Sequence, residues 1–321
     1  NLELSGRPDG GYIKGKYYLF VGDSKAGKSF AVLTTMAEAG ISPGYKDHRL
    51  IYDNVEDGAL MDLRRYFGPG VADRIEQRVS DSVEDFYYTV HDLIEEGKPF
   101  IYALDSMDGL QAEDDGEQFE KRKKAHRAGK KEIPGSYGTA KAKANSSNLR
   151  LLVDGLKKTG SILIIIAQTR MNIGFGSQYN PKTRSGGTSL RFYATNELWF
   201  SVKEKLYKRA KGKDRHVGSL IKIQIQKNRQ SGRESSIEIP IYHSSGLDDL
   251  GSLVDFLIDE GAWTGTDKTV DAPDFAFKGR KEDLITKVQT DGLESSLVAI
   301  VTDLWNQIEV ESRIDRRSKY G

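Results

Sequence analysis

The sequence predicts an α/β protein with a central, mostly parallel sheet that carries helices on both faces. Up to residue 168, apolar runs of strand length alternate with segments of helical periodicity, which is the pattern of parallel strands joined by helices. A glycine-rich loop at residues 22–29 follows the first of these runs. From residue 195 the strand patterns follow one another without helices, so we expect an antiparallel extension of the sheet.

The composition of the 321 residues is that of a folded protein, with 37% hydrophobic and 30% charged residues. No apolar run approaches about eighteen residues and no signal segment opens the chain, so we expect no membrane partner. The absence of cysteine excludes a disulfide scaffold and thiolate metal sites, and it fits a reducing compartment. The formal net charge is only +1, so any binding of nucleic acid has to depend on a local basic surface.

The glycine-rich loop fits the pattern G-x-x-x-x-G-K-[ST], with Lys28 and Ser29 in the last two positions. An apolar strand pattern at residues 17–21 precedes it, and an amphipathic helical pattern continues from Phe30. A chance glycine-rich turn is the alternative, which this strand–loop–helix context disfavours. The loop therefore predicts a binding site for a nucleoside triphosphate.

The chemistry of phosphate binding explains the spacing of this loop. Glycine at both ends lets the backbone approach a polyphosphate, and the N–H groups at the start of a helix face the anion. Lys28 is expected to reach the terminal phosphates, and the hydroxyl of Ser29 is expected to bind Mg²⁺. The residues expected at the nucleotide are Gly22, Asp23, Ser24, Lys25, Ala26, Gly27, Lys28, Ser29 and Phe30.

The other elements follow from apolar periodicity and from breaker residues. Strands are expected at residues 49–55, 99–104 and 161–167, and helices at 59–67, 82–96 and 139–158. Later strands are expected at residues 197–206, 219–226 and 236–242, with a basic link at 208–215 and a helix at 250–258. We therefore divide the chain into a core at residues 1–263, a linker at 264–279 and a small helical unit at 280–321.

The segment from Gln111 to Gly138 interrupts this alternation. It is acidic at first and then strongly basic, with Lys121, Arg122 and Lys123 in a row. So many charges cannot build a core, so we expect this segment to be solvated and mobile.

Three polar residues lie at the ends of predicted parallel strands, where ligands bind in open α/β sheets. Asp105 is expected as a partner of Mg²⁺, although an aspartate at this place is often only a helix cap. Glu56 is expected to orient and deprotonate water, with a surface carboxylate in an acidic patch as the alternative. Gln168 is expected to sense the terminal phosphate, unless it only satisfies backbone groups.

Taken in order, these features resemble the RecA-type recombinases, and most of all the RecA-like recombinases of phages. The resemblance extends from about residue 10 to residue 263, and its most specific part begins at Gln168 and ends at Ala194. The matching blocks are residues 22–29, Glu56, residues 104–106, 167–174, 185–194 and 227–229.

The resemblance implies a RecA-type P-loop ATPase core that uses ATP and Mg²⁺. Within it Glu56 and Lys28 are implied as catalytic residues, and Gln168 as the nucleotide sensor. Lys227 and Arg229 are implied to cross to the ATP of a neighbouring subunit, in the manner of an arginine finger.

Two DNA-binding loops are also implied, at about residues 110–138 and 172–188. Cationic side chains and glycine N–H groups at such loops contact phosphates without reading bases. We expect Met171 and Ile173 to wedge between bases of a stretched single strand. The DNA-facing positions implied are Lys143, Arg150, Arg170, Met171, Asn172, Ile173, Gly186, Gly187 and Thr188.

The sequence departs from the family pattern at three places. The first DNA loop is longer and more basic, which favours salt-dependent binding of DNA unless the charges are only solvated. Leu63 stands where the family has the aromatic residue that stacks on adenine, and Tyr66 is a nearby candidate. Fewer residues precede the phosphate loop, so we expect the arm that docks on a neighbouring subunit to be absent.

The main functional hypothesis is a cytoplasmic, DNA-dependent ATPase of a bacterium or a phage-infected host. It would assemble on single-stranded DNA through self-association bridged by ATP, and it would pair that strand with homologous duplex DNA. One alternative is a ring-forming DNA motor similar to a helicase. Another is an ATP-regulated protein that binds or anneals single strands without strand exchange.

Overall fold

The computed structural model describes residues 1–7, 10–56, 62–128, 139–171, 182–266, 268–314 and 316, with Gln118, Arg122 and Thr139 described by their backbone only. Contacts divide the chain into two compact units. The core unit consists of Tyr12–Lys205 and Ile221–Ile237. The terminal unit consists of Asn1–Gly11, Leu206–Leu220 and Glu238–Gly321.

The described residues contain one large sheet, which is mostly parallel. Its strands are β1 (Lys16–Gly22), β2 (Arg49–Asn54), β3 (Ile75–Arg78), β4 (Phe100–Asp105), β5 (Ile162–Met171), β6 (Lys182–Arg184), β7 (Asn196–Ala210), β8 (Lys213–Asn228), β9 (Ser236–Tyr242) and β10 (Gly246–Leu247). Their order is β10-β9-β8-β7-β1-β5-β4-β2-β3, and β6 pairs with β5 outside this order. β1 is parallel to both β5 and β7, whereas β9 and β10 are antiparallel. The predicted α/β fold is confirmed.

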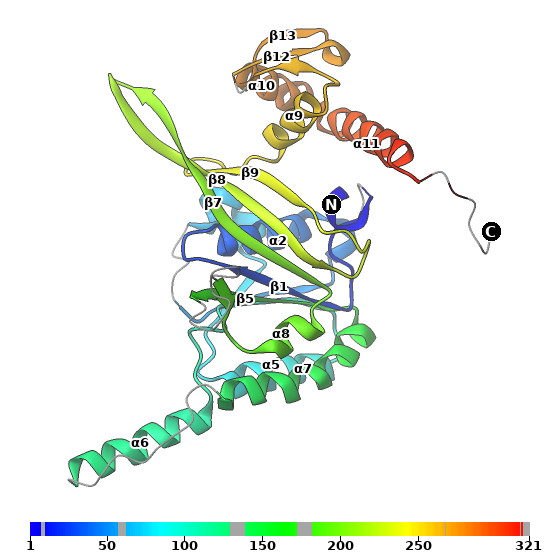
Figure 1. Ribbon diagram of the computed structural model, residues 1–321. Helices are drawn as coiled ribbons and strands as arrows, with labels where there is room; N and C mark the ends of the chain where they lie inside the picture. Colours follow the sequence, from blue (N-terminus) through cyan, green and yellow to red (C-terminus); the bar gives the residue numbers. More distant parts are fainter. Residues whose placement is uncertain are drawn as a thin grey trace. The chain divides into compact units, whose positions relative to one another are not determined.

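Helices cover both faces of the central strands. In the core unit they are α2 (Lys28–Ile41), α3 (Leu63–Phe67), α4 (Pro69–Ala72), α5 (Val83–Glu95), α6 (Glu113–Arg127), α7 (Thr139–Thr159) and α8 (Thr188–Tyr193), with the short 3₁₀ turn η1 (Pro43–Tyr45). Figure 1 shows α2 on one face of β1 and β5, and α5, α7 and α8 on the other.

The central strands are apolar along their whole length because both faces are buried. In β1, Tyr17, Leu19 and Val21 point into a cluster that also includes Phe86 of α5 and Leu152 of α7. The residues between them point to the opposite face and are equally buried, since successive side chains of a strand alternate. This packing holds the carboxyl end of β1, where the phosphate loop begins.

The charged segment after residue 111 forms a helix at residues 113–127, so the loop expected there is wrong, whereas its described side chains are exposed or half-buried, as expected of a solvated segment. Its first turn is acidic and its last turn is basic, which complements the helix dipole. Lys121 pairs with Glu117 at 3.2 Å and Lys123 with Glu120 at 3.0 Å. Such pairs support a helix without a buried face. Residues 129–138 lie outside the described part of the chain.

The second DNA loop and the basic link also contain more regular structure than expected. β5 extends past Gln168 to Met171 and pairs with β6, and α8 begins at Thr188. β7 and β8 continue through the expected link at 208–215 and meet at Lys211 and Gly212, where φ is +50° and +75°. Two consecutive residues with positive φ form the tight turn that suits a twisted hairpin. The prediction of an irregular link at residues 208–215 is therefore wrong, because these residues form the end of a β-hairpin.

The terminal unit combines helices with a small antiparallel sheet. Its elements are α1 (Leu2–Ser5), α9 (Asp249–Asp259), β11 (Thr264–Gly265), β12 (Thr269–Ala272), the 3₁₀ turn η2 (Pro273–Phe275), β13 (Phe277–Arg280), α10 (Lys281–Asp291) and α11 (Glu294–Glu311). Residues 264–279 were expected as a linker, but they form this sheet and share a core with α9, α10 and α11. Trp263 anchors that core, and its indole N–H donates to Asp274 Oδ2 at 2.7 Å.

None of the helices in the described part of the chain is both long and apolar enough to span a membrane.

Candidate active site

The phosphate loop has the backbone geometry that its glycines predict. A Cβ atom at Gly22 would lie 2.4 Å from the carbonyl oxygen of Phe200, so the end of β1 admits only glycine. Gly27 has φ +87° and stands at the N-cap of α2, where no described side chain caps the helix. The N–H groups at the start of α2 are therefore available to an anion, and the loop fits a polyphosphate.

Lys28 is buried inside this loop. Its Nζ donates to the carbonyl oxygens of Gly22 at 2.8 Å and of Asp23 at 2.7 Å. Burial lowers the pKa of Lys28, and the carboxylates of Asp105 and Glu56 act in the opposite direction. A phosphate in the loop would offer Lys28 a stronger, charged partner than the two carbonyl groups.

Ser29 and Asp105, the two residues expected at Mg²⁺, both contact the hydroxyl of Tyr52, which the sequence analysis did not identify. The hydroxyl of Tyr52 on β2 donates to Asp105 Oδ2 at 2.6 Å, and it also contacts the hydroxyl of Ser29. Burial and the neighbouring Asp105 raise the pKa of Tyr52, so the hydroxyl keeps its proton and remains a donor. Mg²⁺ in nucleotide sites takes one or two protein oxygens together with phosphate and water, so Ser29 and Asp105 fit this ion. The described residues contain no group of three His, Cys, Asp or Glu side chains placed to hold a metal by themselves.

Glu56 and Gln168 come together although 112 positions separate them in the chain. Gln168 Nε2 donates to both carboxylate oxygens of Glu56, at 3.0 and 3.1 Å. The hydroxyl of Ser106 donates to the same carboxylate. Two neutral donors thus orient the carboxylate of Glu56.

Asp108 connects this group of residues to the second predicted DNA loop. Its Oδ2 accepts from the backbone N–H of Gln168 at 2.7 Å and from the hydroxyl of Ser185 at 2.6 Å. Its Oδ1 pairs with Arg170 at 3.5 Å. Sequence reasoning missed Asp108, and its only signal was its place three residues after the strand-end Asp105.

Of the DNA-facing positions, the glycine pair has the most restricted backbone. Gly186 and Gly187 have φ of +80° and +86°, and a Cβ at Gly186 would lie 2.4 Å from Leu190 Cδ1. Asn145 of α7 donates to the carbonyl oxygen of Gly186 at 2.9 Å. Thr188 is the first residue of α8.

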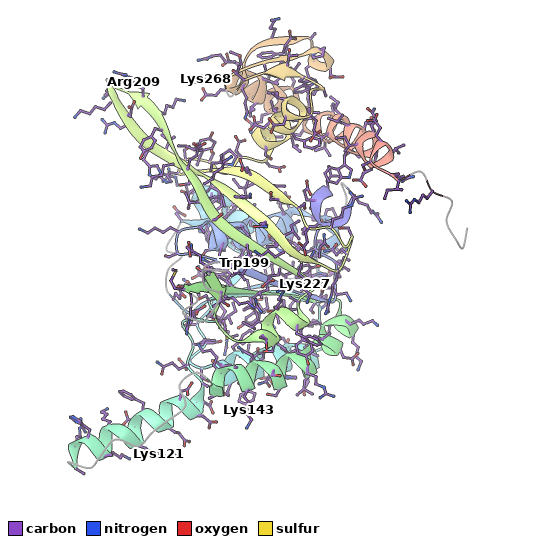
Figure 2. All side chains as sticks on the ribbon, in the orientation of Figure 1. Lys121, Lys143, Trp199, Arg209, Lys227 and Lys268 are labelled. Atoms are coloured by element: carbon purple, nitrogen blue, oxygen red, sulfur yellow. The ribbon has the colours of Figure 1, made fainter. Side chains whose placement is uncertain are left out.

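The other DNA-facing positions are exposed wherever the structure describes them. Arg170 and Met171 lie at the exposed end of β5. Lys143 and Arg150 are exposed on α7, two helical turns apart and hence on one face. Figure 2 shows Lys143 on α7 and Lys121 on α6. Asn172 and Ile173 lie outside the described residues.

Lys227 and Arg229 contact the end of α8 in their own chain. Lys227 Nζ donates to the carbonyl oxygens of Arg191 and, at 3.0 Å, of Phe192. Arg229 Nη2 donates to the same carbonyl of Phe192 at 2.9 Å. Burial, followed by the charge of Arg229, lowers the pKa of Lys227 to about 8.

A fully buried carboxylate, Glu197 of β7, lies next to these two cations. It forms ion pairs with Arg184 at 3.3 Å and with Arg191 at 3.1 Å, without hydrogen-bond geometry to either. Its charge therefore depends on neighbouring cations rather than on directed donors.

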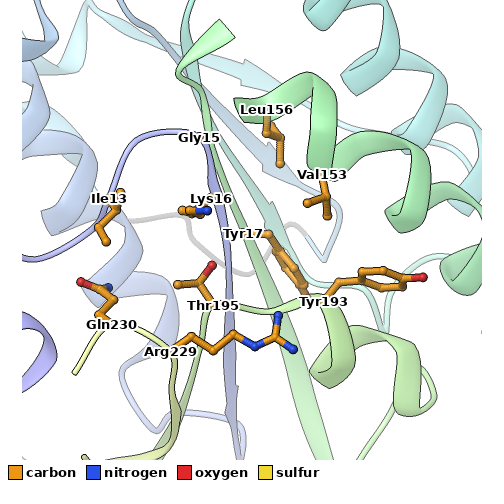
Figure 3. Close-up of a pocket in the computed structure, with 10 residues that line it drawn as sticks. All are labelled: Ile13, Gly15, Lys16, Tyr17, Val153, Leu156, Tyr193, Thr195, Arg229 and Gln230. Atoms are coloured by element: carbon orange, nitrogen blue, oxygen red, sulfur yellow. The ribbon is translucent and has the colours of Figure 1, made fainter. Parts of the chain in front are cut away.

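A cavity of about 160 Å³ lies at the amino end of β1, beside Lys16 and Arg229. Figure 3 shows Tyr17, Tyr193 and Gln230 among the side chains around it. The phosphate loop is at the carboxyl end of β1, so this cavity is not the nucleotide site.

Tyr66, the candidate for stacking on a base, packs against the helix that follows the phosphate loop. Its ring centroid is 5.3 Å from that of Phe30, and the ring of Phe67 is 5.7 Å from Phe30. Leu63 is the first residue of the same short helix, α3.

The chain is similar in sequence to known RecA proteins. A family model described as the RecA N-terminal domain matches residues 125–248. The chain is 28% identical to Protein RecA of Enterococcus faecalis over 273 residues, which is 80% of this chain and 69% of that protein. It is 28% identical to Protein RecA of Chlorobaculum tepidum over 295 residues, 85% of this chain and 75% of that protein. It is 34% identical to Protein RecA of Geobacter metallireducens over 146 residues, 42% of this chain and 41% of that protein. The likeness to phage recombinases stays a prediction.

Proposed function

Because the chain is similar to RecA proteins over most of its length, we propose that it is a DNA-dependent ATPase that assembles on single-stranded DNA and promotes homologous pairing. The observation that carries this proposal is the position of Gln168. It holds the carboxylate of Glu56, and three residues later the same strand, β5, reaches the second predicted DNA loop. A single strand therefore connects the residues expected at ATP to those expected at DNA.

In the proposed reaction, Glu56 accepts a proton from the water that attacks the terminal phosphorus of ATP, and ADP leaves. Lys28 and the N–H groups of the phosphate loop hold the phosphates. Mg²⁺ beside Ser29 and Asp105 would supply charge neutralisation at the phosphate oxygens. Gln168 and Ser106 orient Glu56 for proton transfer.

Lys227 and Arg229 support the part of the proposal that concerns self-association. Both donate to carbonyl groups at the end of α8, which carry only partial charge. A phosphate of a second copy would be a stronger partner for both cations, so ATP would bridge two subunits.

The test is the rate of ATP hydrolysis with and without single-stranded DNA. We expect DNA to stimulate hydrolysis by the wild-type protein, and we expect Lys28→Ala to lose nucleotide binding. Equal rates with and without DNA would contradict the proposal.

Electron microscopy of the complex with an ATP analogue and single-stranded DNA tests the form of assembly. Helical filaments support the proposal, whereas closed rings favour a DNA motor. A Glu56→Gln variant that has lost hydrolysis but anneals strands as well as wild type would favour an annealing protein, since homologous pairing coupled to turnover needs hydrolysis.

A further inference from the structure

Asp23, the second residue of the phosphate loop, contacts the stem of the second predicted DNA loop. Its Oδ1 accepts from the hydroxyl of Thr169, and its Oδ2 forms an ion pair with Lys182. These hydrogen bonds to Lys182 and Thr169 hold the pKa of Asp23 below its usual range, so it remains an anion.

The two partners of Asp23 belong to the two strands of one short hairpin. Thr169 lies on β5 opposite Arg184, and Lys182 lies on β6 opposite Met171. Lys182 and Met171 are the last paired positions of this hairpin in the described residues. The carboxylate of Asp23 thus bridges both strands of the stem.

The main chain of the same residue contacts Lys28. The carbonyl oxygen of Asp23 accepts from Lys28 Nζ at 2.7 Å and from the N–H of Ala26 at 3.3 Å. When Lys28 turns from this carbonyl to a phosphate, the peptide group of Asp23 loses a charged donor. The carboxylate and this peptide group share the Cα atom of Asp23, so a displacement of that atom would also displace the carboxylate between Thr169 and Lys182.

We infer that Asp23 is a positioning residue that couples the phosphate loop to the stem of the DNA loop, through its contacts with Thr169 and Lys182. The inference rests on the proposed function, and it adds a connection that does not pass through Glu56 and Gln168. Since linkage is reciprocal, DNA on the hairpin would change nucleotide affinity by the same factor.

The charge of Lys182 predicts how its removal should change nucleotide binding. Lys182 neutralises Asp23 next to the place where a triphosphate would bind. Without Lys182 the Asp23 carboxylate would repel the phosphates, so Lys182→Met should weaken nucleotide binding. Exposed ion pairs contribute little to stability, and the side chains of Asp23 and Lys182 are both about half exposed. The informative measurement is therefore the effect of nucleotide on DNA affinity, and not the melting temperature.

The experiment measures the affinity of a fluorescent oligothymidylate with and without adenylyl imidodiphosphate and Mg²⁺. The ratio of the two affinities is the coupling factor, about 5–150-fold in typical coupled systems. We expect Asp23→Asn and Lys182→Met each to lower this ratio at least about threefold, and the double variant to lower it no further. Lys182→Arg keeps the ion pair and should keep the ratio.

The control is Asp154→Asn, which removes a more exposed aspartate–lysine pair on α7. It should leave the coupling factor at the wild-type value. A lowered factor in this control would mean that any lost surface pair has the same effect, and it would overturn the inference.

Hydrogen exchange without DNA gives an independent measurement. The analogue should change amide exchange at residues 169–171 and 182–184 in the wild type but not in Asp23→Asn. A wild-type coupling factor of one overturns the proposed function together with this inference. A wild-type factor well above one that Asp23→Asn and Lys182→Met both retain overturns the inference alone.

Discussion

Two ionic clusters in the core unit have opposite charge patterns. In the phosphate loop, one buried cation, Lys28, lies among four carboxylates; these belong to Asp23, Glu56, Asp105 and Asp108. Beside α8, one buried carboxylate, Glu197, lies among cations, two of which pair with it directly. The cations of this second cluster are Arg184, Arg191, Lys227 and Arg229.

The difference shows what each cluster is suited to bind. Asp23 and Asp108 have cationic partners at the hairpin stem, so within the described residues the unneutralised carboxylates are mainly those of Glu56 and Asp105. These two are the residues expected as base and as Mg²⁺ partner. In the second cluster Arg184 and Arg191 share the single negative charge of Glu197, so most of the excess positive charge lies on Lys227 and Arg229. The carboxylates of the first cluster suit Mg²⁺ and a proton beside the phosphates that Lys28 would hold, and the cations of the second cluster suit an anion.

Glu56→Gln is the strongest test of the acidic cluster. The amide keeps the size of the side chain and one acceptor oxygen for Ser106 and Gln168, but it loses the second hydrogen bond from Gln168 and cannot accept a proton from water. We expect the rate of ATP hydrolysis to fall by about 10²–10⁴-fold, the usual contribution of a general base. Affinity for a fluorescent ATP analogue should remain close to wild type. Near-normal turnover in this variant would remove Glu56 from the mechanism.

Glu197→Gln tests the opposite cluster through stability. The substitution leaves Arg184, whose side chain is 14% exposed, without its anionic partner. We expect the free energy of unfolding to fall by about 3–5 kcal/mol, as when one member of a buried ion pair is removed. Urea denaturation followed by circular dichroism measures it. Glu204→Gln is the control, because Glu204 is exposed on the same strand, and a similar loss there would contradict this explanation.

Tyr52→Phe tests whether the hydroxyl of Tyr52 orients Asp105 for binding Mg²⁺. The change removes the hydroxyl that donates to Asp105 Oδ2 and keeps the buried ring. Partners that orient a metal ligand typically contribute about 10–100-fold to metal affinity, so we expect the Mg²⁺ concentration for half-maximal hydrolysis to rise about tenfold. Tyr102→Phe removes a similar bond to Asp53 on neighbouring strands and should leave the Mg²⁺ requirement unchanged.

Lys227 makes the cationic cluster sensitive to pH, because its pKa is lowered to about 8. Between pH 7 and pH 9 its protonated fraction falls about tenfold, so ATP-dependent assembly, measured by light scattering, should weaken over this range. Lys227→Arg stays charged and should remove this dependence. If Lys227→Arg has the same pH profile as wild type, another group is responsible.

The same pKa has the opposite effect on folding. Between about pH 8 and pH 10.4 the unfolded chain binds the proton at Lys227 more strongly than the folded chain does. The contribution of Lys227 to stability therefore rises with pH across this window, while assembly weakens. A parallel fall of both would contradict the assignment.

The sequence by itself determined the phosphate loop, the strand–helix alternation and the place of Glu56, Asp105 and Gln168 where the parallel pairing of the strands ends. Local spacing carries this information, since a glycine pattern specifies a backbone and parallel strands end at one edge of a sheet. The charged helix α6 and the sheet at residues 264–280 were missed because neither shows a strong apolar period. The hairpin turn at Lys211 and Gly212 was also missed, because the basic residues around it were interpreted as a link between strands.

The tertiary structure alone decided which side chains meet. Tyr52 reaches Asp105 because β2 and β4 pair with Asn54 opposite Asp105. Asp23 reaches Thr169, 146 positions away, because Gly22 of β1 pairs with Gln168 of β5. A shift of either register by one residue would turn these side chains to the other face. Register follows from packing of the whole sheet and not from local spacing, so the coupling of the phosphate loop to the hairpin stem became visible only in the folded chain.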